Sequence, residues 1–185
     1  MTDQKRYISP TEQAKMIRAS LRESLPGTKF SVRTSRGGHS ITVTWTDGPT
    51  TAQVQAIVGR YAGGGFDGMQ DLQYSVTRYV AGEPVLMGAT YINAERRLSA
   101  RFITQRLQRV CDRHDVDAAS LALRGSDSVG YWLDIDNPPA HPRTTWEDLR
   151  LIMRDLERYS EASPQDSRTA RTVGTHADVP AYVYG

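Results

Sequence analysis

Hydrophobic residues recur every three or four positions in two early segments of the chain, a spacing typical of helices with one buried face. The first segment begins at Ser9-Pro10, where Ser9 and Glu12 have the spacing of a capping box, and its pattern predicts a helix over residues 10–25. The second follows a turn at residues 47–49 and predicts a helix over about residues 51–61.

Between these two helices, hydrophobic and polar residues alternate, as in strands with one buried face. The alternation covers residues 30–33 and 41–45, on either side of the pair Gly37-Gly38. This pair predicts a two-residue turn in which both glycines have positive φ angles. A phosphate-binding loop would instead need a lysine and a Ser or Thr at the start of a helix, whereas here a strand follows. The segment therefore predicts a β-hairpin.

The pattern changes again after the second helix. Residues 62–71, AGGGFDGMQD, predict a flexible glycine-rich stretch, and residues 72–80 and 85–92 predict a second hairpin. Helical spacing returns over residues 99–114.

Beyond His114 the composition becomes acidic. Residues 121–124 and 131–135 predict a short third hairpin, and residues 145–159 predict an amphipathic helix with acidic residues in its first turn. From Ser160 onward we expect either disorder or an extended arm docked on the rest of the chain.

Together these elements predict an α+β fold, in which two antiparallel β-hairpins form a sheet packed by two to three helices, with a C-terminal hairpin-helix appendage. The expected boundaries are a domain over residues 7–114, the appendage over residues 115–160 and a flexible tail over residues 161–185.

Composition limits the class of protein. The 185 residues suffice for one ordinary domain and an appendage. The single cysteine, Cys111, precludes an internal disulfide and a cysteine-rich zinc site, and its neighbours predict a place in the core. No run approaches the roughly 20 apolar residues that span a bilayer, and the N-terminus lacks the apolar stretch of a secretion signal. We therefore expect a cytoplasmic protein without a membrane partner.

Charge is unevenly distributed along the chain. Residues 1–113 hold 16 Lys+Arg and 9 Asp+Glu, whereas residues 114–185 hold 7 and 12. The first part therefore carries a net charge of +7 and the second −5. This basic first part argues against a mimic of DNA, which would need a large negative excess.

Three runs in the first part resemble a known family: FSVRTSRGGHSITVTWTDGPT, VGRYAGGGFDGMQD and GATYINAERRLS. They are similar to a large polyvalent protein-associated domain, over about residues 7–99. The resemblance implies a protein of a phage or conjugative element, with a role in counter-defence or DNA processing. It implies no reaction and no catalytic residues.

The predicted helix over residues 99–114 carries the strongest candidate binding surface, which we call the arginine stripe. Its five arginines would line the face opposite Phe102 and Leu107; four of them recur every four residues together with Gln105, and Arg106 widens the stripe. They are Arg97, Arg101, Arg106, Arg109 and Arg113. Such a stripe could neutralise phosphates. Alternatively, it is a solvated helix face, or it pairs with the acidic C-terminal helix.

The outward face of the first hairpin is a second candidate surface. Arg33, Arg36 and His39 would lie on this face or at its tip, beside Thr42 and Thr44. Exposed sheet faces and hairpin tips bind nucleic acid in many proteins.

Two aspartate pairs, Asp67 with Asp71 and Asp134 with Asp136, could hold Mg²⁺ for phosphoryl chemistry. Turns and strand ends also favour aspartate, so we predict no metal site and no cofactor. The scattered histidines lack metal-ligand spacing and no nucleophile motif is present, so we also predict no catalytic residue.

These observations favour a non-enzymatic counter-defence protein of a mobile element, comparable to an anti-CRISPR or anti-restriction protein. Its expected partner is nucleic acid or a host defence nucleoprotein complex, bound through the arginine-rich face. The alternative is a small divalent-metal-dependent enzyme that acts on nucleic acid.

Overall fold

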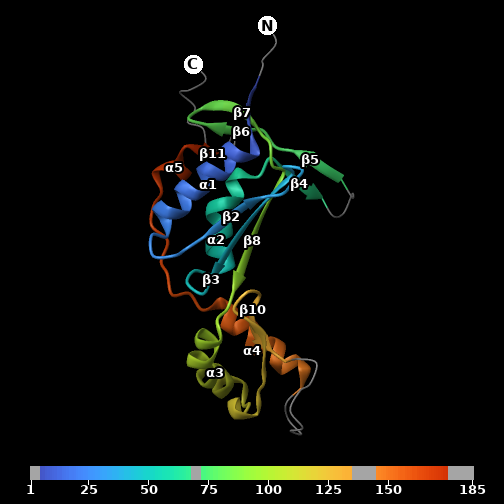
Figure 1. The fold of residues 1–185 in the computed structure, drawn as a ribbon, viewed down its shortest axis with the longest axis vertical. Helices are drawn as coiled ribbons and strands as arrows, with labels where there is room; N and C mark the ends of the chain where they lie inside the picture. Colours follow the sequence, from blue (N-terminus) through green and yellow to red (C-terminus); the bar gives the residue numbers. More distant parts are fainter. Residues whose placement is uncertain (1–4, 68–71, 135–144, 175–185) are drawn as a thin grey trace. The chain divides into compact units, whose positions relative to one another are not determined.

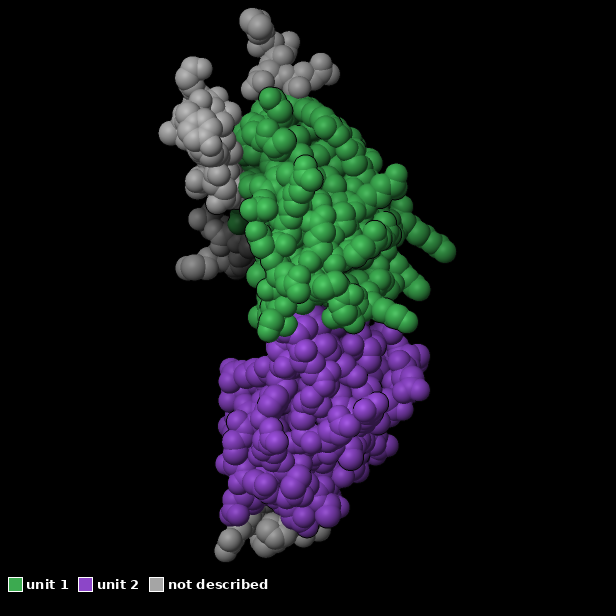
Figure 2. Space-filling view, turned by 90° about the vertical axis from the view of Figure 1, so that its left-hand side faces the viewer, with its two compact units in different colours: residues 1–44, 51–95, 163–185 green, residues 45–50, 96–162 purple. Residues whose placement is uncertain are grey.

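A computed structural model describes residues 5–67, 72–134 and 145–174, except for the side chains of residues 65–67, 72 and 73 (Figure 1). The chain divides into two compact units (Figure 2). Unit 1 comprises residues 1–44, 51–95 and 163–185, and unit 2 comprises residues 45–50 and 96–162. The α+β class is confirmed.

Unit 1 begins with β1 (Arg6–Ile8), which the sequence did not reveal, and continues into α1 (Pro10–Ser24). The Ser9 side chain accepts a hydrogen bond from the Glu12 N–H and so caps α1, as predicted. The Glu12 carboxylate, however, forms an ion pair with Arg6, so the reciprocal half of the capping box is not seen. The second predicted helix is α2 (Thr51–Val58), which ends in a 3₁₀ turn, η1 (Gly59–Tyr61).

The first predicted hairpin is confirmed, but its predicted turn is wrong. Strands β2 (Ser31–Thr34) and β3 (Ser40–Thr46) pair antiparallel, and β8 (Tyr91–Arg97) lies on the other side of β3. The Ser35 N–H donates to the Ser40 carbonyl, so the loop has four residues, 36–39. Of its two glycines only Gly38 has a positive φ, 73°.

The described part of the glycine-rich stretch after α2, residues 62–67, ends in a strand rather than forming a flexible link. Strand β4 (Gly64–Asp67) pairs antiparallel with β5 (Leu72–Ser75), and β6 (Arg78–Val80) pairs with β7 (Glu83–Met87). The predicted second hairpin is therefore confirmed for β6 and β7, but its predicted strands were too long, because residues 72–80 form two strands with different partners and residues 85–92 reach from β7 into β8. The two-residue turn with two positive φ angles occurs here, at Ala81 (53°) and Gly82 (89°).

A buried glutamine joins three segments of unit 1. Gln13 on α1 is fully buried, and its side-chain amide donates to the carbonyl oxygens of Tyr61 and Ala89. Its side-chain oxygen accepts from the Ala89 N–H at 2.8 Å. One side chain thus satisfies the Tyr61 carbonyl and the Ala89 N–H, backbone groups after α2 and after β7 that lie in the core.

Residues 163–174 return to unit 1 and dock there, as one of the two expectations for the tail proposed (Figure 1, red). They form α5 (Arg168–Arg171), which packs on α1, and β11 (Val173–Gly174), which pairs with β6. Glu23 of α1 holds α5 in place, because its carboxylate accepts hydrogen bonds from the Ser167 hydroxyl and from the hydroxyl and N–H of Thr169. Residues 175–185 of the predicted tail lie outside the described part.

These bonds, those from the Thr169 hydroxyl foremost, lower the pKa of Glu23 from 4.5 to about 2. A carboxyl whose folded pKa is lowered stabilises its contact above the unfolded pKa and loses that effect as pH falls through the folded value. We therefore expect docking of α5 to weaken between pH 4.5 and about 2. The side-chain carboxyl carbon of Glu23, followed by NMR against pH, should titrate near 2, and Thr169→Val should move its midpoint toward 4.5. A midpoint near 4.5 in the unchanged chain would contradict this.

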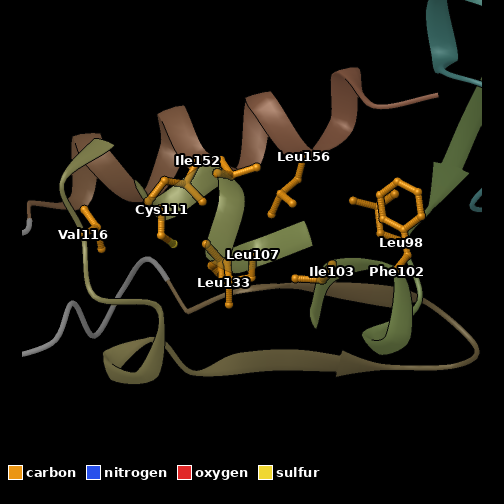
Figure 3. Close-up of a cluster of buried hydrophobic side chains, with 10 residues drawn as sticks. Leu98, Phe102, Ile103, Leu107, Cys111, Val116, Leu133, Ile152 and Leu156 are labelled. Atoms are coloured by element: carbon orange, nitrogen blue, oxygen red, sulfur yellow. The ribbon is translucent and has the colours of Figure 1, made fainter. Parts of the chain in front are cut away.

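Unit 2 packs two helices against a hairpin, as Figure 3 shows. Its elements are α3 (Ala100–His114), η2 (Ala118–Ser120), β9 (Leu123–Ser126), β10 (Gly130–Leu133) and α4 (Trp146–Arg158). The helices and third hairpin predicted from the sequence are thereby confirmed. Phe102 and Leu107 of α3 meet Ile152 and Leu156 of α4 in the core.

Cys111 lies in this core, as predicted, and burial raises the pKa of its thiol to about 11. It therefore stays a thiol at neutral pH and serves packing.

The compact units do not follow the boundary expected at residue 114, since α3 packs with the residues after it. Unit 2 consequently holds 11 Lys+Arg and 12 Asp+Glu, so the basic and acidic halves of the sequence meet within one unit. Among the described helices, none is long and apolar enough to cross a membrane.

Candidate nucleic-acid interface

The eight residues predicted to bind a partner divide between the two units. Unit 1 holds Arg33, Arg36 and His39 on the β2–β3 hairpin. Unit 2 holds the arginine stripe, Arg97, Arg101, Arg106, Arg109 and Arg113. The predicted arginine-rich face thus becomes two groups, one in each unit.

Two arginines of the stripe are engaged within unit 2. Arg106 forms an ion pair with Glu161, and its guanidinium lies 4.0 Å from the centroid of the Phe102 ring. Arg113 Nη2 lies 3.7 Å from Asp155 Oδ2 on α4. For these two residues the sequence-based alternative, pairing with acidic residues of the C-terminal part, describes the observed contacts.

The Asp155 carboxylate also faces His114, whose Nε2 lies 3.1 Å from Oδ2. This hydrogen bond is the main cause that holds the pKa of Asp155 below its usual range, with Arg113 adding to it. The contact joins the C-terminal end of α3 to α4, so it serves the packing of unit 2.

Arg96 beside the stripe is structural as well. Its guanidinium donates to the carbonyl oxygens of Asp47, Gly48 and Glu157, and burial lowers its pKa. Asp47 in turn accepts hydrogen bonds from the N–H and hydroxyl of Ser99, the residue that caps α3. The segment over residues 45–50 is thereby fixed to the start of α3.

Arg101, Arg109 and Arg113 are the exposed members of the stripe, and of these only Arg113 forms an ion pair with a described residue, Asp155. No hydrogen bond or ion pair joins the side chains of Arg101 and Arg109 to another described residue. Arg97, at the end of β8, is half-buried. The stripe that can meet a partner is therefore shorter than the sequence predicted.

The hairpin of unit 1 presents its predicted residues to solvent. Arg33 on β2 and Arg36 and His39 in the loop are exposed, as the alternation predicted. None of the three side chains forms an ion pair within the described residues. Their charges and ring are therefore available to a partner.

The loop that carries Arg36 and His39 has a defined place. A side chain on Gly38 would come within 3.2 Å of Pro10 at the start of α1, so the loop lies against that helix. The His39 carbonyl accepts hydrogen bonds from the N–H groups of Thr90 and Tyr91, which brings β8 beside the loop.

Tyr91 is a surface residue that the sequence analysis missed. Its side chain is 36% exposed at the start of β8, next to His39. Asn93, two residues further along the strand, is exposed as well. The alternation of β8 could have revealed both, since Ile92 between them is buried. We call Arg33, Arg36, His39 and Tyr91 the hairpin corner.

The aspartate pairs come together in no described site. Asp67 ends β4 and its partner Asp71 lies outside the described residues. Asp134 is nearly buried and forms an ion pair with Arg124 at 2.7 Å, and Asp136 lies outside the described residues. Within the described part of the chain no three His, Cys, Asp or Glu side chains cluster as metal ligands.

Comparison with known families gives the hairpin corner a context. Residues 8–99 match the model of a family, large polyvalent protein associated domain 29. Through these residues the chain belongs to that family. The polyvalent domain contains the whole hairpin corner, but of the arginine stripe it contains only Arg97.

The polyvalent domain associates the chain with phages and mobile elements, as the resemblance of its three sequence runs implied. No curated protein and no solved structure matches the chain. The residues of α3, the third hairpin and α4 lie beyond the matched part of the chain.

Proposed function

We propose that this chain is a non-enzymatic counter-defence protein of a phage or conjugative element, and that its hairpin corner holds nucleic acid, free or within a host defence complex. The observation that carries this proposal is the exposure of two arginines and a histidine on the β2–β3 hairpin of the polyvalent domain, with an exposed tyrosine at the adjoining start of β8. Anti-CRISPR and anti-restriction proteins are the classes of activity that such binding would serve.

The chemistry of the hairpin corner suits a nucleic acid. Arg33 and Arg36 are forked donors without an intramolecular ion pair among the described residues, so they can contact phosphates. His39 and Tyr91 offer rings on which unpaired bases stack. The sheet face around them is polar and carries threonines, whose hydroxyl groups can donate to phosphate oxygens.

Binding to short DNA and RNA tests the proposal. We expect the full chain to lose affinity steeply between about 50 and 200 mM salt, because bound phosphates release counterions. The double variant Arg33→Glu, Arg36→Glu should weaken binding about tenfold or more and make the salt dependence shallower. Fluorescence anisotropy with labelled oligonucleotides measures both effects.

A matched control separates the hairpin corner from net charge. The double variant Lys15→Glu, Lys29→Glu changes the charge by the same amount at exposed positions of unit 1 outside the corner. It should keep most of the affinity. An equal loss in both double variants, or no nucleic-acid binding at low salt, would contradict the proposal.

The alternative, a divalent-metal-dependent enzyme acting on nucleic acid, predicts turnover that stops with EDTA. Binding that survives EDTA without turnover supports the binding protein instead. Asp134→Ala is the variant to compare, because Asp134 is the described member of the second aspartate pair.

A further inference from the structure

The outward face of α4 carries a row of arginines that lies outside the hairpin corner and outside the arginine stripe. Arg150, Arg154 and Arg158 recur every four residues, opposite the buried Leu149 and Ile152. All three arginines are exposed. At 1.5 Å of rise per residue, the row extends over about 12 Å.

The arginines of the row are charged at any physiological pH, and two of the four carboxylates of α4 have partners outside the row. Asp148 of α4 accepts from the N–H and hydroxyl of Thr145 in the capping box, and these bonds lower its pKa. Asp155 faces His114 and Arg113. No ion pair joins the three arginines of the row to a described carboxylate, although Glu147 and Glu157 are exposed on the same helix.

A large aromatic surface lies at one end of the row. Trp146, the first residue of α4, is 55% exposed. The Arg150 guanidinium lies 4.9 Å from its ring centroid, so the ring and the row form one continuous surface. An exposed tryptophan costs apolar hydration, and the core of unit 2 does not bury it.

We propose that Trp146 with Arg150, Arg154 and Arg158 forms a second binding surface, in unit 2, for single-stranded nucleic acid. A base stacks on the indole ring, and the arginines follow the phosphates. A duplex keeps its bases stacked inside and offers none to the ring, so the surface selects single strands. This surface consists of residues in unit 2 alone, so it can be tested independently of the hairpin corner in unit 1.

The test uses the full chain and a labelled single strand of about 12 nucleotides, with the matching duplex as a competitor. Trp146→Ala should weaken binding of the single strand about tenfold. Arg154→Glu with Arg158→Glu should weaken it further and make the salt dependence shallower. Trp146→Phe should restore part of the affinity, because a smaller ring still stacks.

Trp132 is the matched control. It lies on β10 of the same unit, is 44% exposed and stands opposite Arg124 in the hairpin. Trp132→Ala should leave binding unchanged if α4 carries the surface. Equal losses in the two tryptophan variants, equal affinity for the duplex, or no effect of Trp146→Ala would each overturn the proposal. If Arg33→Glu with Arg36→Glu lowers the affinity and none of the α4 variants does, the hairpin corner is the binding surface and the α4 proposal is wrong.

Discussion

Replacing Gln13 with leucine is expected to lower the free energy of unfolding by about 3 to 5 kcal/mol, among the largest effects a single substitution has. Leucine has a similar size but no polar atoms. The Ala89 N–H and the Tyr61 carbonyl would lose their buried side-chain partner, and water cannot replace a fully buried side chain without a cavity. Chemical denaturation followed by circular dichroism measures the change.

Gln105→Leu is the control for this substitution. Gln105 is an exposed residue of α3, so the same chemical change there should alter stability by less than about 0.5 kcal/mol. A loss below about 1 kcal/mol for Gln13→Leu would mean that the backbone groups find other partners. A variant that fails to fold while the control folds normally agrees with the expectation.

The second large effect is expected for Gly63→Ala, which should cost about 3 kcal/mol by overpacking. A Cβ atom on Gly63 would lie 2.5 Å from the Met87 carbonyl oxygen and 3.1 Å from that of Ala89. Both are backbone atoms, so relief requires the segment just before β4 to move away from the end of β7. That movement would also strain the hydrogen bond from the Gly63 N–H to the Ala89 carbonyl, at 3.0 Å.

Gly27, just after α1, provides the comparison. A Cβ atom there meets nothing within 4 Å, so Gly27→Ala should be neutral or stabilise the chain slightly by restricting the unfolded state. Thermal unfolding of the two alanine variants side by side measures the difference. Equal melting temperatures would show that the strands around Gly63 yield easily.

Gly63, which lies in a run of three glycines, shows a limit of prediction from the sequence. A run of glycines indicates a flexible link by composition, but glycine is equally required where two backbones approach closely. A flexible link and a close approach of two backbones can be distinguished only when the neighbouring backbone is known. Strand β1 escaped prediction for a related reason, because three residues carry little pattern and its parallel partner β7 is more than seventy residues away.

Helices were predicted more accurately than strands because their caps and periodicity are local. Ser9, Ser99 and Thr145 each cap the helix that begins one residue later. The partners of the arginine stripe could not be predicted from local sequence, because periodicity shows which side of a helix is polar but not which residues contact that side. Arg106 forms an ion pair with Glu161, and Arg113 forms one with Asp155, and both partners lie far away in the sequence.

The residues of the candidate sites also divide into those that local sequence predicts and those that only the fold brings together. The exposure of Arg33, Arg36 and His39 followed from the alternation of one hairpin. Tyr91 joined them through a strand pairing that no single segment encodes. The α4 arginines recur every four residues in the sequence, but the net acidic composition of the C-terminal part does not indicate a row of exposed cations there.

The order of the chain through the two units has a consequence for how such a protein can change over time. Unit 2 is made of two excursions, residues 45–50 and 96–162, each of which leaves unit 1 and returns to it. The longer excursion can be exchanged for another of different sequence while α1, β2 and the docked residues 163–174 keep their own partners. The short excursion would have to change with it, because Asp47 holds Ser99 and Arg96 holds Asp47. A mobile element could thus change unit 2 by replacing one insert and adapting the six residues 45–50, the first two of which end β3.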